Sequence, residues 1–437
     1  MASKPVQSLG EYVDVLHRSG LVPREQLDAA LAEVAVLPAS EADYMALAKR
    51  LLSRKLVTAW QNNHLLEGRH KGFFLGKYKL LSYLGTGGMS TVYLAEHTMM
   101  RRRVAIKVLL ESQASETSLE RFRRECRAVA GLDHPNIVRA HDFASDGKFR
   151  YLVMEYIEGP DLQTLVDKQG PLPYLVAANY IRQTADGLTN AHEAGLIHRD
   201  IKPANLLRDP KGVIKLLDLG VARITNGDGE VVLTVAGGQE NMLGTVDYLS
   251  PEQAIDSHQV DGRTDIYALG ATLYFLLTGH PPFPEGTQAQ RLLFHQVKQP
   301  ASIYIDRPDA PPALVGICQR MMAKKPDDRF ASALEVSQAL KRWELSHSRQ
   351  ARTSDVIEAS QRTAANPVSL SDTKNAKSET DTMVVDAQIR VVCSGCGTAF
   401  RAPAVAANRE VKCPKCENGV MVPVPAGLGQ AGAPQNS

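Results

Sequence analysis

The start of the chain carries apolar side chains at helical spacing. Leu27, Leu31 and Val34 share one face of a helix, and the same spacing recurs around Leu47. Residues 1–75 are therefore predicted to form an α-helical N-terminal extension. No residue pattern here suggests chemistry, so we expect a small docking or regulatory domain.

A faint repeat with a period of 35 residues runs through this extension. Such a period fits two related helix-turn units. Two unrelated amphipathic helices would give the same pattern, and the sequence alone does not choose between them. The matched pairs are Leu21 with Leu56, Val22 with Val57, Gln26 with Gln61 and Leu31 with Leu66.

From Tyr78 onward the pattern changes to short apolar runs that predict strands. The turn-forming Gly85–Ser90 and the basic Arg101–Arg103 separate the first three runs, as in an antiparallel meander. A helix predicted at Glu120–Leu132 places Glu125 on its apolar face, where a carboxylate needs a cationic partner. The predicted strands are Tyr78–Leu84, Thr91–Glu96, Val104–Leu109, Val138–Phe143 and Phe149–Ile157.

Gly159-Pro160 ends this β-rich part, and helices dominate beyond it. The exception is a strand at Val213–Leu217, which runs into Asp218-Leu219-Gly220. Residues 346–387 have few large apolar side chains and predict a flexible linker, and residues 425–437 predict a disordered tail. The predicted helices are Leu162–Lys168, Val176–Ala194, Ile266–Thr278, Thr287–Gln299, Ala313–Ala323 and Ser332–Leu345.

Composition narrows the class of protein. The 437 residues are 44% hydrophobic, enough for two or three domains. The 50 basic and 48 acidic side chains give a net charge of +2, which offers no overall electrostatic reason to expect nucleic acid or a membrane surface as partner. The first twenty residues lack the apolar core of a signal peptide, and no run is long enough to span a bilayer. We expect a cytoplasmic protein.

The glycine-rich turn after Leu84 is the first candidate for chemistry. Glycines without a Cβ let backbone N–H groups approach a phosphate closely, although a plain hairpin turn would look the same. Lys107 ends a nearby alternating strand, and Glu125 lies on the helix that follows. A Lys107–Glu125 pair that holds the lysine against phosphates explains all three features together.

The second candidate is the eight-residue loop His198–Asn205. Asp200 could accept a hydroxyl proton, while Asn205 and the later Asp218 supply the oxygen ligands that Mg²⁺ prefers. Pro203 prevents an undisturbed helix, so these groups lie on a rigid loop. Together the residues indicate phosphoryl transfer, in which positioning and charge neutralisation supply most of the catalysis.

With these motifs in order, the chain from Tyr78 to Leu345 resembles a protein kinase of the bacterial eukaryotic-like Ser/Thr type. The resemblance implies an α+β, bilobal protein kinase fold over residues 76–345. A β-rich N-lobe would cover 76–158 and a helical C-lobe 159–345. It also implies MgATP (or MnATP) as cofactor and Ser/Thr hydroxyls of proteins as acceptors.

The resemblance assigns roles residue by residue. Asp200 would be the catalytic base, Lys202 would steady the γ-phosphate, and Lys107 would hold the α/β-phosphates, oriented by Glu125. Asn205 and Asp218 would bind the metal ions. Glu252 with Arg329, and Asp265, match residues that support the site from within the helical lobe, and His198 matches a packing residue. The implied ATP-binding residues are Leu84, Gly85, Gly87, Gly88, Val92, Ala105, Lys107, Met154, Glu155, Ile157 and Leu207.

Three positions depart from the family pattern. Ser90 replaces the third glycine of the phosphate loop, Leu219 the aromatic of Asp-Phe-Gly, and Ser250 the alanine of Ala-Pro-Glu. Each keeps a size or polarity near that of the family residue. These departures bear on the rate of the expected reaction and not on its type.

Regulation is expected in the activation segment. Arg199 precedes Asp200, and in the resembling family such an arginine receives a phosphate from that segment. Thr234 is the preferred autophosphorylation site and Thr225 the second, although threonine is also common in plain loops. Thr245 would help align Asp200.

Two C-x-x-C pairs near the C-terminus predict a structural zinc site. Cys393 and Cys396 are separated from Cys413 and Cys416 by sixteen residues, 397–412. Four thiolates around zinc would fold a segment too short for its own core. Residues 388–424 therefore resemble a zinc ribbon, with no expected catalysis.

Two other functions remain open at this point. The chain could be a nucleotide-binding pseudokinase scaffold that acts through its terminal modules, although such proteins usually lack one of the residues found here as Lys107, Asp200 and Asp218. Only a few basic residues support nucleic-acid binding by the ribbon. We expect proteins instead as partners of the extension and the ribbon.

Overall fold

The computed structural model describes two compact units, Met1–Ser360 and Gln361–Ser437. Within them the described residues are 4–38, 43–86, 90–109, 131–217, 246–255, 260–347, 388–393, 395–396, 398–403, 410–413, 415–416 and 418–421. Among these residues no helix is long and apolar enough to cross a membrane.

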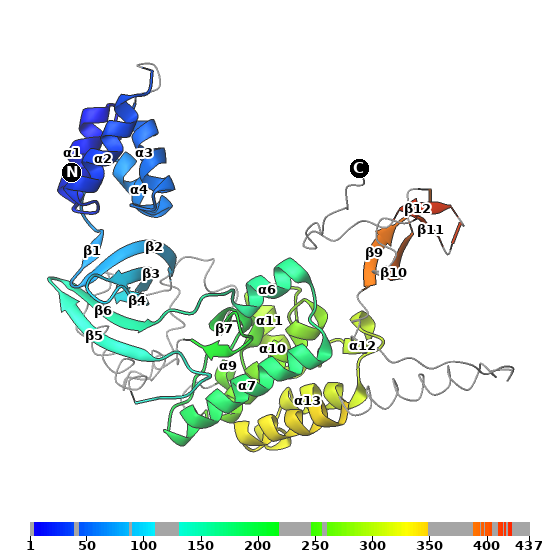
Figure 1. Ribbon diagram of the computed structural model, residues 1–437. Helices are drawn as coiled ribbons and strands as arrows, with labels where there is room; N and C mark the ends of the chain where they lie inside the picture. The colour runs from blue at the N-terminus through cyan, green and yellow to red at the C-terminus, as the bar shows by residue number, and fades with distance from the viewer. Residues whose placement is uncertain are drawn as a thin grey trace, which may run out of the picture. The chain divides into compact units, whose positions relative to one another are not determined.

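Four short helices form the N-terminal extension (Figure 1). They pack around a common core that includes Tyr12, Leu16, Leu27, Leu47 and Leu65, all fully buried. The apolar spacing seen in the sequence therefore marks one shared interior. The helices are α1 (Leu9–Ser19), α2 (Arg24–Ala35), α3 (Tyr44–Ser53) and α4 (Ala59–Leu66).

The 35-residue repeat corresponds to a repeated helix pair. Helices α1 and α3 begin at Leu9 and Tyr44, and α2 and α4 at Arg24 and Ala59. The N-caps of α1 and α3 are also 35 residues apart: Ser8 accepts from the Glu11 N–H and Asp43 from the Ala46 N–H. After both helices the backbone turns left-handed, with φ 65° at Gly20 and 56° at Lys55. The structure thus favours related helix pairs over chance periodicity.

An antiparallel sheet of six strands follows, in the order β1-β2-β3-β4-β6-β5. Apolar residues cover both faces of β4, so the sheet has one hydrophobic cluster around Ile106 and another around Ala105. The strands are β1 (Phe74–Leu75), β2 (Tyr78–Thr86), β3 (Ser90–His97), β4 (Arg103–Leu109), β5 (Ala140–Asp146) and β6 (Phe149–Glu155).

Several boundaries predicted in this part were wrong, including the end of the strand predicted at Phe149–Ile157, which ends at Glu155. The strand expected from Val138 begins only at Ala140, because the Val138 N–H donates to the Leu216 carbonyl (3.0 Å), outside this sheet. Residues 131–132, predicted as the end of a helix, are not helical, and the rest of that predicted helix lies outside the described residues. The turn after Leu84 is also shorter than expected, because β2 includes Gly85 and β3 begins at Ser90.

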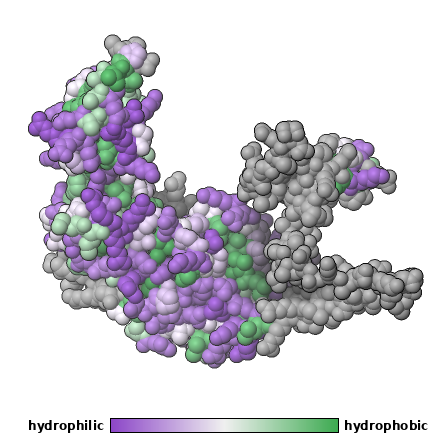
Figure 2. Space-filling model, in the orientation of Figure 1, coloured by the Kyte–Doolittle hydropathy of each residue, from purple (hydrophilic) through white to green (hydrophobic). Residues whose placement is uncertain are grey.

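Helices make up most of the rest of this unit, around one large core. Helix α10 is buried on every side, as expected for a helix that is apolar all round. The face shown in Figure 2 is mostly hydrophilic with scattered apolar patches. The elements are α6 (Leu162–Gln169), α7 (Tyr174–Glu193), η2 (Pro203–Asn205), β7 (Leu206–Arg208), β8 (Ile214–Leu216), η4 (Val246–Tyr248), α9 (Pro251–Ile255), α10 (Arg263–Thr278), α11 (Gln288–Val297), α12 (Ile303–Asp306), α13 (Pro312–Met321), η5 (Pro326–Asp328) and a helix at 333–347.

The second unit contains two antiparallel hairpins. Strands β9 (Gln388–Val392) and β10 (Ala399–Pro403) form one, and β11 (Glu410–Lys412) and β12 (Gly419–Met421) form the other. Each C-x-x-C pair follows the first strand of its hairpin. Among the described residues the buried core consists of Val391, Val420 and two of the four cysteines, too little apolar surface for independent folding.

Candidate active site

Strand β4 places Lys107 inside the sheet. Its Cα lies opposite Val92 on β3 and Leu152 on β6, and the residue is only 9% exposed. A buried ammonium needs anionic partners. The predicted partner Glu125 lies outside the described residues.

One apolar cluster collects most of the residues expected around the adenine. Ala105, Met154 and Ile157 are buried in it, and Val92 and Leu207 pack against it. They come from β3, β4, β6, the segment after β6, and β7, so the sheet and the helical part both contribute. Leu84, also expected to bind ATP, is an exposed apolar side chain next to Gly85 near the end of β2.

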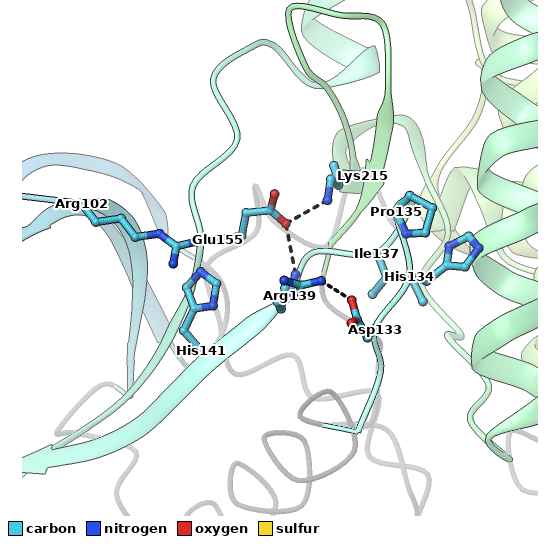
Figure 3. Close-up of a pocket in the computed structure, with 9 residues that line it drawn as sticks. All are labelled: Arg102, Asp133, His134, Pro135, Ile137, Arg139, His141, Glu155 and Lys215. Atoms are coloured by element: carbon cyan, nitrogen blue, oxygen red, sulfur yellow. Dashed lines mark hydrogen bonds and ion pairs between the residues drawn. The ribbon is translucent and has the colours of Figure 1, made fainter. Parts of the chain in front are cut away.

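The Glu155 side chain lines a polar pocket of about 270 Å³ (Figure 3). Its carboxylate accepts a hydrogen bond from Lys215 Nζ at 2.9 Å. The carboxylate is thus tied to β8, and Glu155 is left with its backbone groups for any contact on the adenine side. The resemblance to a protein kinase implies that the segment from Glu155 to Ile157 offers backbone hydrogen bonds to adenine, and the engaged carboxylate is compatible with this expectation.

The loop that begins at His198 is hydrogen-bonded to a buried aspartate on α10. Asp265, fully buried, accepts the N–H of His198 at 2.8 Å and the N–H of Arg199 at 2.7 Å. The Arg199 carbonyl accepts from Gln253 Nε2 at 3.0 Å. Arg199 has φ 64°, a strained left-handed value for a residue other than glycine, and bonds on both sides of it hold it there.

His198 supports the loop as predicted. It is fully buried, its Nε2 lies 2.7 Å from the Leu217 carbonyl, and its Nδ1 accepts the N–H of Asp200 at 3.2 Å. Both ring nitrogens are therefore engaged with backbone. The histidine fixes where Asp200 sits and has no atom left for chemistry.

Asp200, Lys202 and Asn205 converge on this loop. Lys202 Nζ lies 3.0 Å from Asp200 Oδ2, and Asn205 Nδ2 donates to the same oxygen at 3.0 Å and to the Asp200 carbonyl at 2.7 Å. Because its nitrogen makes both bonds, Asn205 keeps its amide oxygen for a cation. The donor set therefore fits a carboxylate base beside a magnesium ligand and a phosphate-binding lysine.

A second polar pair stabilises the helical part below this loop. Arg329 donates to both carboxylate oxygens of Glu252, at 2.6 and 2.8 Å, and is 2% exposed. Burial alone would raise the pKa of Glu252, but the hydrogen bonds and charge of Arg329 more than offset it and lower the pKa. The structure confirms the expected Glu252–Arg329 contact.

Several predicted site residues lie outside the described residues, so their positions remain predictions. They are Gly87, Gly88, Glu125, Asp218, Thr225, Thr234 and Thr245.

The four cysteines of the second unit come together as predicted. All four sulfur atoms lie within 4.8 Å of one another, with Cys393 3.5 Å from Cys416 and Cys396 3.7 Å from Cys413. Tetrahedral thiolates at zinc–sulfur distances of ~2.3 Å would be ~3.8 Å apart. The cluster therefore fits a four-coordinate zinc ion.

Comparison with known proteins agrees with this geometry. The protein kinase domain model matches residues 78–342. The serine/threonine-protein kinase PknB of Mycolicibacterium smegmatis is 37% identical over 265 residues, which is 60% of this chain and 42% of PknB. The serine/threonine-protein kinase PrkC of Bacillus subtilis is 37% identical over 267 residues, 61% of this chain and 40% of PrkC. The chain thus spans about two fifths of these relatives.

Among solved structures, the PknI kinase domain of M. tuberculosis aligns over 62% of this chain and 97% of that domain, with 29% identity and a TM-score of 0.49.

Proposed function

The chain belongs to the protein kinase family, and from this premise we propose that it transfers the γ-phosphoryl group of ATP to serine or threonine hydroxyls of proteins. The arrangement of Asp200, Lys202 and Asn205 carries the proposal, because a carboxylate, an ammonium and a side-chain amide lie together on one hydrogen-bonded loop, as a base, a phosphate-binding cation and a metal ligand would. The names of the two relatives support the choice of hydroxyl acceptor.

In this proposal each described side chain has one task. Asp200 accepts the proton of the acceptor hydroxyl, and Lys202 neutralises charge on the transferred group. Lys107 holds phosphate oxygens, the cluster around Met154 holds the adenine, and Asn205 with Asp218 binds Mg²⁺ or Mn²⁺, which offsets phosphate charge when bound.

The test is phosphate transfer from labelled ATP to a generic basic protein, followed by analysis of the labelled amino acids. We expect phosphoserine or phosphothreonine, dependence on Mg²⁺ or Mn²⁺, and loss of transfer in Lys107→Met. Labelled tyrosine alone, or nucleotide binding with no transfer, would favour a different acceptor or the pseudokinase scaffold. That scaffold is not favoured, since Lys107, Asp200 and Asp218 are all present.

We also propose that the activation segment is autophosphorylated, first at Thr234 and second at Thr225, with Arg199 as the group that receives the phosphate and Thr245 as a residue that aligns Asp200. The position of Arg199 beside Asp200 supports this. Mass spectrometry after incubation with MgATP should find phosphate on Thr234, and its absence there would reject that choice.

For the second unit we propose structural zinc bound by Cys393, Cys396, Cys413 and Cys416, in a cytoplasmic protein that keeps these thiols reduced. The sulfur positions support it. Protein purified without chelator should contain about one zinc per chain, and Cys413→Ser should lose most of it. Zinc content near zero would refute the site.

We retain the predicted division of the chain: helical extension 1–75, kinase domain 76–345, linker 346–387, zinc ribbon 388–424 and tail 425–437. Proteins with Ser/Thr acceptors are the proposed substrates, and the two terminal modules are proposed to bind proteins rather than nucleic acid.

A further inference from the structure

The start of α4 meets strand β2 through a buried glutamine. Gln61 is fully buried, and its Nε2 donates to the Leu80 carbonyl at 2.6 Å. Its Oε1 accepts the N–H of Thr58 at 2.9 Å, which closes the capping box of α4. One amide therefore joins the N-cap of a helix in the extension to a strand of the sheet.

The neighbouring carbonyl of β2 is bound from the same cap. Thr58 Oγ1 donates to the Leu81 carbonyl at 2.5 Å. The β2–β3 register shifts between Leu80 and Ser82, so Leu81 is the extra residue of a β-bulge. Bulges redirect the strand that follows them, and here the strand passes a second register shift, between Tyr83 and Gly85, before the glycine-rich turn.

Aromatic side chains continue this contact toward the glycine-rich turn. Trp60 of α4 lies edge-on to Tyr93 of β3, with ring centroids 5.9 Å apart, and Tyr93 lies edge-on to Tyr83 of β2 at 6.2 Å. The Tyr83 hydroxyl donates to Thr86 Oγ1 at 2.8 Å. Packed side chains thus run from the extension to the last described residue before the turn.

We propose that Thr58 and Gln61 are positioning residues for the nucleotide. They fix the bulge at Leu81 in β2 and thereby the position of the β2–β3 hairpin relative to the ATP phosphates. This rests on the proposed function, in which that hairpin covers the phosphates. The extension then acts as a brace of the nucleotide site, and a ligand or modification that loosened α4 would weaken ATP binding.

The repeat supplies a matched control. Gln26 occupies the position 35 residues before Gln61, near the start of α2, but it is exposed and follows Pro23 instead of a capping threonine. Gln61→Leu removes both bonds of the buried amide, while Gln26→Leu makes the same chemical change in the paired helix. Thr58→Val and Thr58→Ser form a second comparison, since only serine keeps the hydroxyl.

We expect Gln61→Leu and Thr58→Val to raise the KM for ATP about three- to tenfold, as the loss of one hydrogen bond would. The kcat and the KM for the protein substrate should stay within about twofold, and Gln26→Leu and Thr58→Ser should behave as wild type. Hydrogen exchange of the amides of β2 should be faster in the first two variants only.

The exchange measurement does not depend on catalysis, so it separates this inference from the proposed function. Faster exchange of β2 in Gln61→Leu and Thr58→Val, together with a wild-type chain that transfers no phosphate, would leave the brace intact and reject the kinase proposal. Unchanged exchange and unchanged KM for ATP in both variants would overturn the brace. Should Gln61→Leu fail to fold, the Thr58→Val and Thr58→Ser pair decides the outcome by the same two readouts.

Discussion

Two polar clusters in the helical part use similar residues for different ends. The reaction cluster is Asp200, Lys202 and Asn205, and the support cluster is Asp265, Glu252 and Arg329. The side chains of Lys202 and Asp200 are 19% and 26% exposed, whereas those of Asp265 and Arg329 are fully buried and that of Glu252 is 21% exposed.

In the support cluster Arg329 uses all of its side-chain N–H donors. Besides Glu252, Arg329 donates to the carbonyls of Ala323, Arg263 and Lys324 at 2.7, 2.9 and 3.0 Å. In the reaction cluster the bonds among Asp200, Lys202 and Asn205 lie within the loop, and the side chains of Asp200 and Lys202 are partly exposed to solvent. A buried side chain whose hydrogen-bond donors are all used indicates a structural role. A partly exposed side chain that keeps an unused acceptor indicates a role in chemistry.

The sharpest test of this comparison is Asp200→Asn, which removes the base but keeps its shape. We expect kcat to fall on the order of 10³-fold while the melting temperature and nucleotide affinity hardly change. Transfer assays and thermal unfolding of the same preparation measure both. Activity within tenfold of wild type would remove Asp200 from the reaction cluster.

Arg329→Met should have the opposite effect, in that it lowers the stability of the fold rather than acting first on kcat. It leaves Glu252, whose side chain is 21% exposed, without its partner, so the loss of unfolding free energy should lie near the lower end of the roughly 3–5 kcal/mol that breaking a buried pair costs. Arg342→Met, at an exposed position on the helix at 333–347, is the control and should cost little. Equal stability of the two variants in urea unfolding would show that the support cluster is misassigned.

Lys202→Met sharpens the comparison within the reaction cluster. Because the Lys202–Asp200 pair is partly exposed, its loss should change stability by less than ~1 kcal/mol. The kcat should fall about 10- to 100-fold through lost charge neutralisation. Lys215→Met removes a similarly exposed pair with Glu155 and should leave kcat near wild type. Equal losses in both variants would argue for a general charge effect.

Sequence reasoning predicted the fold where a single pattern decides the structure. Strand alternation placed β4 with Lys107, and the continuous apolar stretch from Ile266 predicted a helix where α10 lies. The spacing of the two C-x-x-C pairs predicted that four sulfur atoms would lie close together, and they do. In each case the signal lies within one short segment.

It failed where the outcome depends on contacts between distant segments. Val138 is as apolar as a strand residue, but it bonds to Leu216 across the fold. In the sequence only the repeat marks Gln61, because nothing local shows that its amide bonds to β2 beside a bulge. The extension was predicted to hold no chemistry of its own, and its contacts suggest that it acts through the strand it touches.

The smallest expected effect concerns pH and the support cluster. Since the folded chain holds the pKa of Glu252 below its ordinary value of 4.5, the ionised pair contributes stability above that value, which is lost as the pH falls through the folded pKa. Glu252→Gln cannot ionise, so the stability gap between wild type and this variant should be full at pH 7 and narrow below about pH 4.5. Urea unfolding at several pH values measures the gap. A gap that stays constant into acid would mean that hydrogen-bond geometry, rather than the charge of Glu252, stabilises the pair.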